Sequence, residues 1–179
     1  MKYQYKYCSN CAALYDKKSE TFYLCPKCDF RIFVSPKPAV GVILFNSKNQ
    51  ILLTKRSYNP GKGKWGLAGG FMNPGEDAEV SLSREINEEI GVTIKNFKIF
   101  GSYSGNYFYK GINYKTVDII YTAKILDKQT IKLSKESTEF KFFNLKEIST
   151  DEIAPEDAKK AVTELIRLKQ KHKRPTIDK

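Results

Sequence analysis

The four cysteines most constrain how this chain can fold, because all of them fall within its first 28 residues. They form two Cys-x-x-Cys pairs, Cys8/Cys11 and Cys25/Cys28, with thirteen residues between the pairs. Two such pairs can bring four thiolates together around one tetrahedral Zn²⁺, at Zn–S distances of about 2.3 Å. Two disulfides are the alternative, which a reducing compartment disfavours. The pattern therefore predicts a small zinc ribbon in which the ion is structural.

A module of this size cannot bury a sufficient core alone, so the metal would supply much of its folding free energy. We expect a small hairpin between the cysteine pairs, because Tyr15, Phe22 and Tyr23 favour β-structure. The two prolines in residues 34–38 favour an extended connector. The sequence therefore predicts a zinc ribbon over residues 1–35 and a second domain over residues 36–179.

The second domain alternates strand-like and helix-like segments. Apolar, β-branched runs at 39–45 and 50–55 flank a turn-forming segment and predict a hairpin. Further strands are expected around 97–103, 116–126 and 140–145. Two helices are expected, one over 77–90 and one after Pro155 with Ala158, Val162, Leu165 and Ile166 on one stripe. This order of elements predicts the α+β class with mixed layers of helix and sheet.

Residues 70–92 carry the pattern that indicates chemistry. Pro74 and Gly75 favour a turn, and Gly91 favours the end of a helix that starts near residue 77. With about 100° between successive residues, an apolar stripe forms along this helix: Ala78, Leu82, Ile86 and Ile90. The carboxylates of Glu85, Glu88 and Glu89 occupy the arc beside that stripe. Three acids are therefore predicted to crowd beside a buried face.

Such crowding is costly without a cation, because like charges in a poorly solvated groove repel one another. Oxygen ligands select Mg²⁺ or Mn²⁺ over zinc, and magnesium commonly shares its coordination sphere with substrate phosphates. The pattern therefore predicts phosphoryl-group hydrolysis, in which the cation neutralises diphosphate oxygens and lowers the pKa of a water. Arg84, one helical turn before Glu88, can orient a carboxylate by a bidentate contact. An ordinary charged helix does not explain why acids outnumber bases on this arc.

The same segment resembles the Nudix box at every fixed position of that motif: Gly70, five residues, Glu76, seven residues, then Arg84-Glu85-Ile86-x-Glu88-Glu89-x-Gly91-Val92. The resemblance extends from about residue 38 to residue 168. It implies the family fold, an α/β/α sandwich around a mixed β-sheet, preceded here by the small zinc ribbon.

By this resemblance, Glu85 and Glu89 are the core metal ligands and Glu88 is a further ligand or base. Arg84 and Glu76 organise the loop.

The resemblance also implies that the carbonyl beside Gly70 completes the metal coordination. Glu136 aligns with a downstream glutamate that many relatives add to the metal cluster, and Glu139 is the near alternative.

A zinc module before a Nudix domain resembles the layout of NADH pyrophosphatases, some of which remove NAD caps from RNA. The signature rich in Gln, Pro and Trp that follows the box in that subgroup is missing, and residues 101–109 read GSYSGNYFY instead. Tyr107 and Tyr109 could stack on a base, an interaction worth about 1–3 kcal/mol, or be ordinary strand and core aromatics. Arg56 and Trp65 could contact phosphate or base, or belong to a strand end and the core.

The leading hypothesis is a hydrolase of a nucleoside diphosphate linked to another moiety, such as NADH, ADP-ribose or a related dinucleotide. The alternatives are a sanitising pyrophosphohydrolase for oxidised nucleoside triphosphates and a non-catalytic regulator that binds nucleotides or nucleic acid. The net charge of +11 favours polyanionic ligands. The basic tail could contact nucleic acid, although such ends are more often frayed: Lys169, Lys171, Lys173 and Arg174.

No apolar run reaches the roughly 18 residues that span a bilayer, and the N-terminus lacks the hydrophobic segment of a secretory signal. We therefore expect a cytoplasmic protein without a membrane partner. The sequence does not determine the oligomeric state, and a homodimer is one of the possible states.

Overall fold

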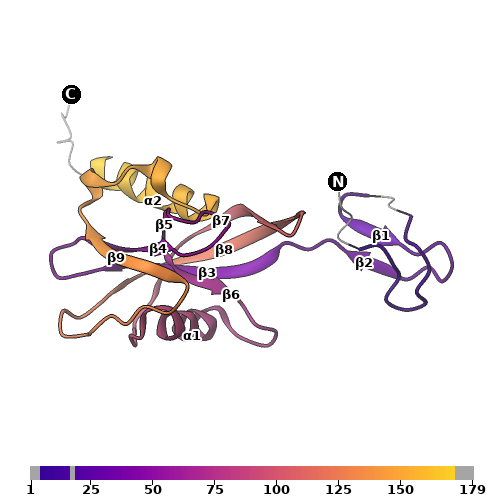
Figure 1. The fold of residues 1–179 in the computed structure, drawn as a ribbon, viewed down its shortest axis with the longest axis horizontal. Helices are drawn as coiled ribbons and strands as arrows, with labels where there is room; N and C mark the ends of the chain where they lie inside the picture. The colour runs from indigo at the N-terminus through magenta and orange to yellow at the C-terminus, as the bar shows by residue number, and fades with distance from the viewer. Residues whose placement is uncertain (1–4, 17–18, 172–179) are drawn as a thin grey trace, which may run out of the picture.

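The structure is a computed structural model that describes residues 5–16 and 19–171. Lys173 and Arg174 of the basic tail lie outside the described residues. Figure 1 shows two sheets at opposite ends of the molecule, joined by an extended connector. The smaller sheet contains β1 (Phe22–Leu24) and β2 (Arg31–Phe33) and shares no strand with the larger, seven-stranded sheet.

The N-terminal hairpin differs from the predicted one. Its strands lie on either side of the second cysteine pair, with Tyr23 opposite Ile32, so the pair itself forms the reversal between β1 and β2. The Asp29 N–H closes this turn on the Cys25 carbonyl at 3.1 Å. Tyr15 lies outside these strands, and its ring packs against Tyr23 at a centroid distance of 5.7 Å. The prediction placed the hairpin between the pairs because it did not anticipate that the cysteine turn itself would reverse the chain.

The large sheet has seven strands: β3 (Lys37–Phe45), β4 (Ile51–Arg56), β5 (Trp65–Gly66), β6 (Ala68–Phe71), β7 (Lys98–Tyr109), β8 (Ile112–Lys124) and β9 (Ser137–Phe143). The main order is β5-β4-β3-β8-β7, with β6 paired to β3 and β9 paired to β4. β3 and β8 run parallel, whereas the other pairs run antiparallel. The predicted mixed sheet is confirmed, and the short strands β5 and β6 are additions that the sequence patterns did not indicate.

Two α-helices cover the two faces of this sheet, α1 (Ala78–Ile90) on one and α2 (Glu156–Lys171) on the other (Figure 1). Of the predicted stripe of α1, Leu82, Ile86 and Ile90 are fully buried in one apolar cluster with the sheet, and Ala78 packs against that cluster partly buried. On the other face, α2 packs Val162 and Leu165 into a second cluster. Two short 3₁₀ helices, Leu145–Glu147 and Thr150–Glu152, precede α2. The α+β class and the sandwich of helices around a mixed sheet are therefore confirmed.

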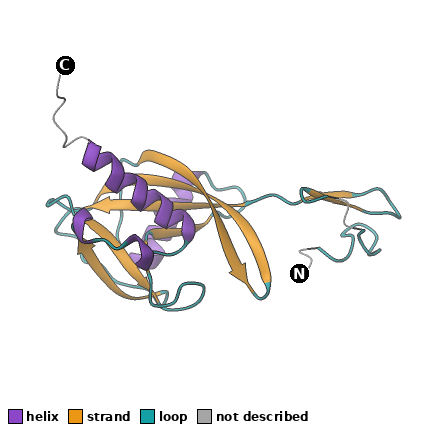
Figure 2. Ribbon diagram, turned by 90° about the horizontal axis from the view of Figure 1, so that it is seen from above, coloured by secondary structure: helices purple, strands orange, loops and turns teal. Residues whose placement is uncertain are grey.

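The hairpin of β7 and β8 is longer than predicted. The strands continue to a two-residue turn, Lys110 and Gly111, in which both residues have positive φ, 46° and 84°. Such a turn matches the twist of the strands it connects. Residues 104–109, expected to lie beyond the strand, therefore belong to β7, and Figure 2 shows the hairpin projecting past the helices.

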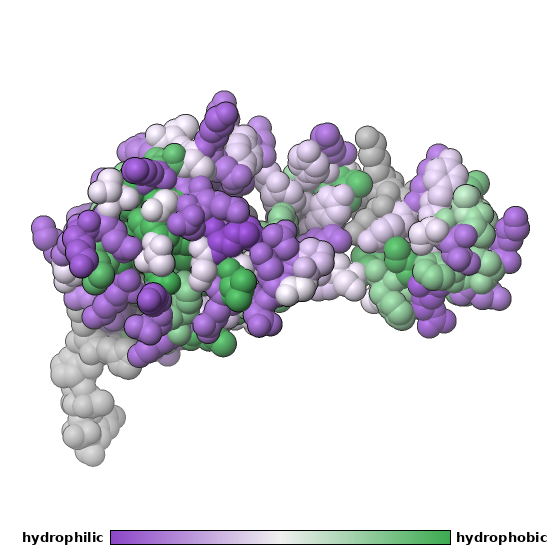
Figure 3. All heavy atoms as spheres, turned by 90° about the horizontal axis from the view of Figure 1, so that it is seen from below, coloured by the Kyte–Doolittle hydropathy of each residue, from purple (hydrophilic) through white to green (hydrophobic). Residues whose placement is uncertain are grey.

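The face of the molecule in Figure 3 is mostly hydrophilic, with apolar patches that include part of the N-terminal module. Large apolar side chains exposed on that module are Tyr7, Leu14, Phe30 and Phe33. Within residues 5–16 and 19–171, no helix combines the length and the hydropathy that crossing a membrane requires.

Candidate active site

The helix α1 begins and ends as its sequence predicts. Gly75 has a φ of 86° in the turn before the helix, which the Glu76 N–H closes on the Asn73 carbonyl at 3.1 Å. Gly91 has a φ of 68° and donates its N–H to the Asn87 carbonyl at 3.0 Å, which ends the helix. Positive φ at these positions favours glycine, because other residues are strained there. The local sequence thus fixes where the acidic residues of α1 lie.

Arg84 joins the loop before α1 to the acidic face of the helix. Its Nε and one terminal nitrogen contact the two carboxylate oxygens of Glu76 at 2.8 and 2.9 Å. The other terminal nitrogen lies 2.7 Å from Glu85 and 3.2 Å from Glu88. Hydrogen bonding to Arg84 lowers the pKa of Glu76 to about 2. The bidentate contact of Arg84 is therefore made to Glu76.

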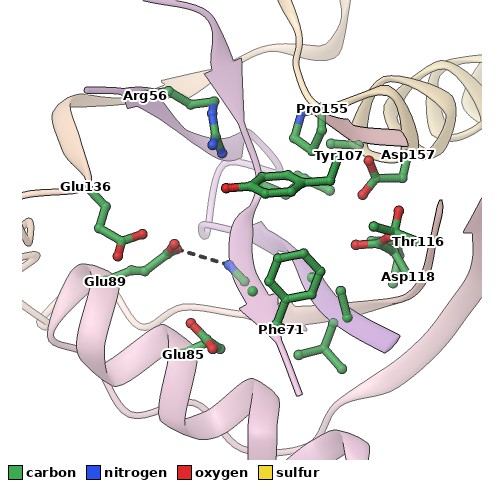
Figure 4. A pocket seen from close by; sticks show the side chains of 18 of the residues that line it. Arg56, Phe71, Glu85, Glu89, Tyr107, Thr116, Asp118, Glu136, Pro155 and Asp157 are labelled. Carbon is green, nitrogen blue, oxygen red and sulfur yellow. Dashed lines mark hydrogen bonds between the residues drawn. The ribbon is translucent and has the colours of Figure 1, made fainter. Parts of the chain in front are cut away.

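A cavity of about 370 Å³ opens beside α1, and Figure 4 shows its side chains. Glu85 and Glu89 reach one end of it from α1, and Glu136 reaches the same end from the segment before β9. The Gly69 N–H donates to the Glu89 carboxylate at 3.0 Å. A side chain on Gly70 would place its Cβ 2.6 Å from a Glu85 oxygen, so it would displace the Glu85 carboxylate from this position. The Gly70 backbone and two box carboxylates thus share one end of the cavity.

These carboxylates lie in a poorly solvated place. Burial raises the pKa of Glu89 to about 8, and the charges of Glu136 and Glu85 contribute to the increase. Burial also raises the pKa of Glu85. No basic side chain forms an ion pair with Glu89 or Glu136 among the residues that the structure describes. Oxygen donors that repel one another in this way suit a hard divalent cation.

The segment that carries Glu136 is hydrogen-bonded on both sides. The Ser134 N–H donates to the Glu89 carbonyl at the end of α1 at 2.8 Å. On the other side, the Ser57 N–H donates to the Glu136 carbonyl at 2.9 Å, and the Ser57 hydroxyl donates to the Lys135 carbonyl at 2.6 Å. The backbone position of Glu136 is therefore set by α1 and by the end of β4 together.

The four cysteines form a separate centre in the N-terminal module. All four are free thiols, and the Sγ–Sγ distances are 3.7 Å for Cys8 and Cys28 and 3.5 Å for Cys11 and Cys25. Four sulfurs at tetrahedral corners, each about 2.3 Å from one ion, lie about 3.8 Å apart. Their ligand atoms all lie within 4.8 Å of one another. The arrangement therefore fits a single tetrahedral ion, and the disulfide alternative is not what the structure contains.

The family of the chain follows from a match over most of its length. Residues 35–165 match the model of the NUDIX domain family. The chain belongs to the Nudix family. The complete box, on the helix and loop described above, agrees with this membership.

Three relatives illustrate the match. The Nudix chain is 33% identical over 116 residues to an ADP-ribose pyrophosphatase from Methanocaldococcus jannaschii, covering 65% of this chain and 66% of that protein. It is 32% identical over 100 residues to the NAD-capped RNA hydrolase NudC of Pseudomonas fluorescens, covering 55% and 36%. A NUDIX hydrolase crystal structure from Nitrosomonas europaea aligns over 97% of both chains with a TM-score of 0.70 and 29% identity. The chain thus spans between 36% and 66% of these two sequence relatives.

Among the predicted substrate contacts of the Nudix domain, Arg56 and Tyr107 line the cavity. Trp65 and Tyr109 do not line it. Trp65 is partly buried against Phe143, with ring centroids 4.9 Å apart, and belongs to the apolar cluster under α2. Tyr109 is 47% exposed and stacks on Tyr107 from outside the cavity. The contact of Trp65 or Tyr109 with a substrate stays a prediction, and the structure gives Trp65 a packed position and Tyr109 an exposed strand position.

The structure also separates the remaining candidate acids. The Glu88 side chain is 60% exposed and does not line the cavity. Glu139 pairs with Lys55 at 3.3 Å outside the cavity, whereas Glu136 points into it. Cavity residues that the sequence did not single out include Tyr58, Phe71, Thr116, Asp118 and Asp157.

Tyr58 and Glu136 line the same cavity, where burial and then a hydrogen bond with the Glu136 carboxylate raise the pKa of the Tyr58 phenol. The sequence carried no signal for it beyond its place two residues after Arg56.

Proposed function

We propose that the protein is a pyrophosphohydrolase that uses a divalent cation to cleave a diphosphate linkage in a nucleoside diphosphate linked to another moiety. The observation that carries this proposal is the convergence of Glu85, Glu89 and Glu136, from two separate segments, on one end of a cavity that Arg56 also lines (Figure 4). Membership of the Nudix family and relatives named as a pyrophosphatase and a hydrolase of NAD-capped RNA support it. NADH, ADP-ribose and related dinucleotides are the proposed substrates.

In this proposal, Glu85, Glu89 and Glu136 hold Mg²⁺ or Mn²⁺ together with the carbonyl beside Gly70, and Glu88 serves as a further ligand or as a base. When bound, the cation supplies positive charge to the diphosphate and increases the acidity of a water. The donor set consists of oxygens only, which is the set that these hard cations prefer.

The remaining polar residues position the reacting groups. Arg84 fixes the loop through Glu76 and restrains the Glu85 carboxylate. Arg56 donates its Nε–H to the Pro60 carbonyl at 2.8 Å, which orients the guanidinium at the cavity. The terminal nitrogens of an arginine held in this way can donate to two phosphate oxygens at once. Arg56 is therefore the proposed phosphate-binding residue.

The proposal assigns the cysteine centre to one structural Zn²⁺. It is supported by the Sγ–Sγ distances and by the absence of an open coordination position in a site with four thiolates. The zinc ribbon then covers residues 1–35, and the Nudix hydrolase domain covers residues 36–179.

Product analysis tests the function. The protein is incubated with NADH, ADP-ribose, diadenosine diphosphate and oxidised nucleoside triphosphates, each with Mg²⁺ or Mn²⁺. We expect a nucleoside monophosphate and a phosphorylated remainder from the linked diphosphates. Release of monophosphate and pyrophosphate from the triphosphates alone would support the sanitising alternative instead. No hydrolysis of any compound, together with tight nucleotide binding, would support the regulator.

A further inference from the structure

The end of the cavity remote from Glu89 contains a second pair of acids, Asp118 on β8 and Asp157 in the first turn of α2 (Figure 4). Both are buried, with exposures of 8% and 4%. The Oδ2 atom of Asp118 is buried without a hydrogen-bond partner among the described residues. A buried polar atom normally has a partner, so an atom of this kind that lines a cavity indicates that something else supplies the partner.

The surroundings of this pair exclude a phosphate as that partner. Neither acid forms an ion pair with a basic side chain in residues 5–16 and 19–171. The hydroxyl of Thr116, which is 7% exposed, and the amide of Asn106 line the same cavity. Burial raises the pKa of Asp118 to about 8, and the neighbouring Asp157 carboxyl contributes to the increase. One proton shared between two carboxyls leaves oxygen atoms that accept hydrogen bonds.

The backbone of β7 approaches this pair closely. A side chain on Gly105 would place its Cβ 2.7 Å from the Thr116 hydroxyl and 2.9 Å from the Asp157 Oδ1. The pair is therefore enclosed on that side, and the cavity is the side from which a ligand can reach it. Between the pair and the glutamates lie the rings of Phe71 and Tyr107, whose centroids are 5.3 Å apart (Figure 4).

We propose that Asp118 and Asp157 bind N–H or O–H groups on the nucleoside half of the substrate and select substrates by those donors. This inference rests on the proposed function for its orientation: a diphosphate held at Glu85, Glu89 and Glu136 leaves the organic half of the substrate to extend past the aromatic rings. The donors have two sources in a nucleoside, the amino group of a base and the hydroxyls of the ribose. A substrate that lacks the required donor leaves the acceptors unpaired, which lowers kcat/KM by about 10- to 100-fold.

The test compares three substrates: ADP-ribose, its analogue with unsubstituted purine in place of adenine, and its analogue with 2′-deoxyribose in the adenosine half. For the wild type we expect one analogue to fall at least tenfold below ADP-ribose in kcat/KM. In Asp118→Asn, which replaces one of the two acceptor oxygens by an NH₂ donor, we expect this gap to shrink below threefold. If Asp118→Asn closes the difference in kcat/KM between ADP-ribose and the purine analogue, the base supplies the donor. If it closes the difference for the deoxy analogue, the sugar supplies the donor.

The matched control is Asp151→Asn, because Asp151 lies on the surface in an ion pair with Lys159 and should leave all three values unchanged. Asp157→Asn gives an independent reading if circular dichroism shows that Asp118→Asn does not fold. Equal kcat/KM for the three substrates in the wild type, or an equal loss for all three in both cavity variants, would overturn the inference and leave a structural role for the pair.

Affinity measured by calorimetry in EDTA, where hydrolysis is suppressed, separates this inference from the proposed function. If the wild type hydrolyses none of the three compounds but binds them with a donor preference that Asp118→Asn removes, the function fails and the inference stands. If hydrolysis occurs with ratios that neither cavity variant changes, the function stands and the inference fails. If no compound binds or reacts, both fail.

Discussion

The cysteine centre and the carboxylate end of the cavity both contain side chains that can bind a metal, but their geometries differ. The four thiols already lie with all ligand atoms within 4.8 Å of one another, and within the described part of the chain no other group of three or more Cys, His, Asp or Glu meets that distance. The carboxylates of Glu85, Glu89 and Glu136 line a cavity instead. Four soft ligands at one point leave no coordination position for a substrate, whereas separated hard ligands leave room for one.

This difference follows from chain geometry. Each cysteine pair occupies one tight turn, and the two turns are equivalent: Ala12 and Asp29, the residues after each pair, have φ values of 59° and 57°. The carboxylates come from a helix and from a segment before β9, whose positions are set by the large sheet. A structural site thus needs little beyond two local turns, whereas the candidate active site depends on the complete domain.

The largest expected effect would establish the carboxylate end as the reactive site. Glu89→Gln should keep the fold and reduce turnover by at least about 10³-fold, because a buried ligand loses its charge. Turnover is measured by product release with Mg²⁺. Glu139→Gln is the control, since Glu139 lies outside the cavity against Lys55. A Glu89→Gln enzyme that retains a tenth of the wild-type turnover would contradict the assignment.

The next prediction separates the two centres by their metals. EDTA should abolish turnover, and Mg²⁺ or Mn²⁺, but not Zn²⁺, should restore it, because oxygen ligands prefer hard cations. Elemental analysis of the purified protein should find about one zinc per chain at the thiolates. Rescue by zinc alone, or four freely titrating thiols without zinc, would remove the distinction between the centres.

A smaller effect on activity is expected from the cysteine centre. Cys25→Ser should lose zinc and loosen the N-terminal module, because Cys25 is fully buried and the metal supplies much of the folding free energy. Turnover should stay within about twofold of wild type, since a closed site takes no part in the chemistry. Hydrogen exchange shows whether residues 36–179 remain folded in this variant. If they do and turnover is lost, the module contributes to the active assembly.

The smallest effect concerns the ion pair that organises the loop. The pKa of Glu76 is lowered from 4.5 to about 2, so its stabilisation is present above pH 4.5 and is lost as the pH falls towards 2. Glu76→Gln should therefore lower the free energy of unfolding at pH 7 and flatten its dependence on pH between these values. Denaturant titrations at several pH values measure this. Glu79→Gln is the control, because the Glu79 side chain is exposed in the first turn of the same helix.

The parts of the molecule that could be predicted from the sequence are those fixed by local residues. Helix α1 was predicted to within one residue because its start and end depend on Gly75 and Gly91 next to an apolar stripe. Glu136 could be proposed from the family resemblance alone. Nothing in its own sequence distinguishes it from Glu139, because only the register of β9 on β4 turns one into the cavity and the other towards Lys55.

Asp118 and Asp157 show what the sequence could not reveal. Asp118 is a single acid within an apolar strand, and Asp157 looks like an ordinary acid in the first turn of a helix, where negative charge is favoured. The two meet only because α2 packs across the sheet. Trp65 was ambiguous for the same reason, since an aromatic residue beside a strand suits either a core or a ligand site until its neighbours are known.

The double attachment of the segment before β9 has a consequence for the entropy of assembling the active site. Ordering the backbone of one residue costs about 1–2 kcal/mol. The hydrogen bonds from Ser134 to α1 and from Ser57 to Glu136 order this segment when the chain folds, so its entropy is lost before any ligand binds. A cation that binds between Glu89 and Glu136 then has only side-chain rotamers to fix. Its affinity should accordingly be sensitive to Ser57→Pro, which removes the N–H bound to Glu136, although Ser57 never touches the ion.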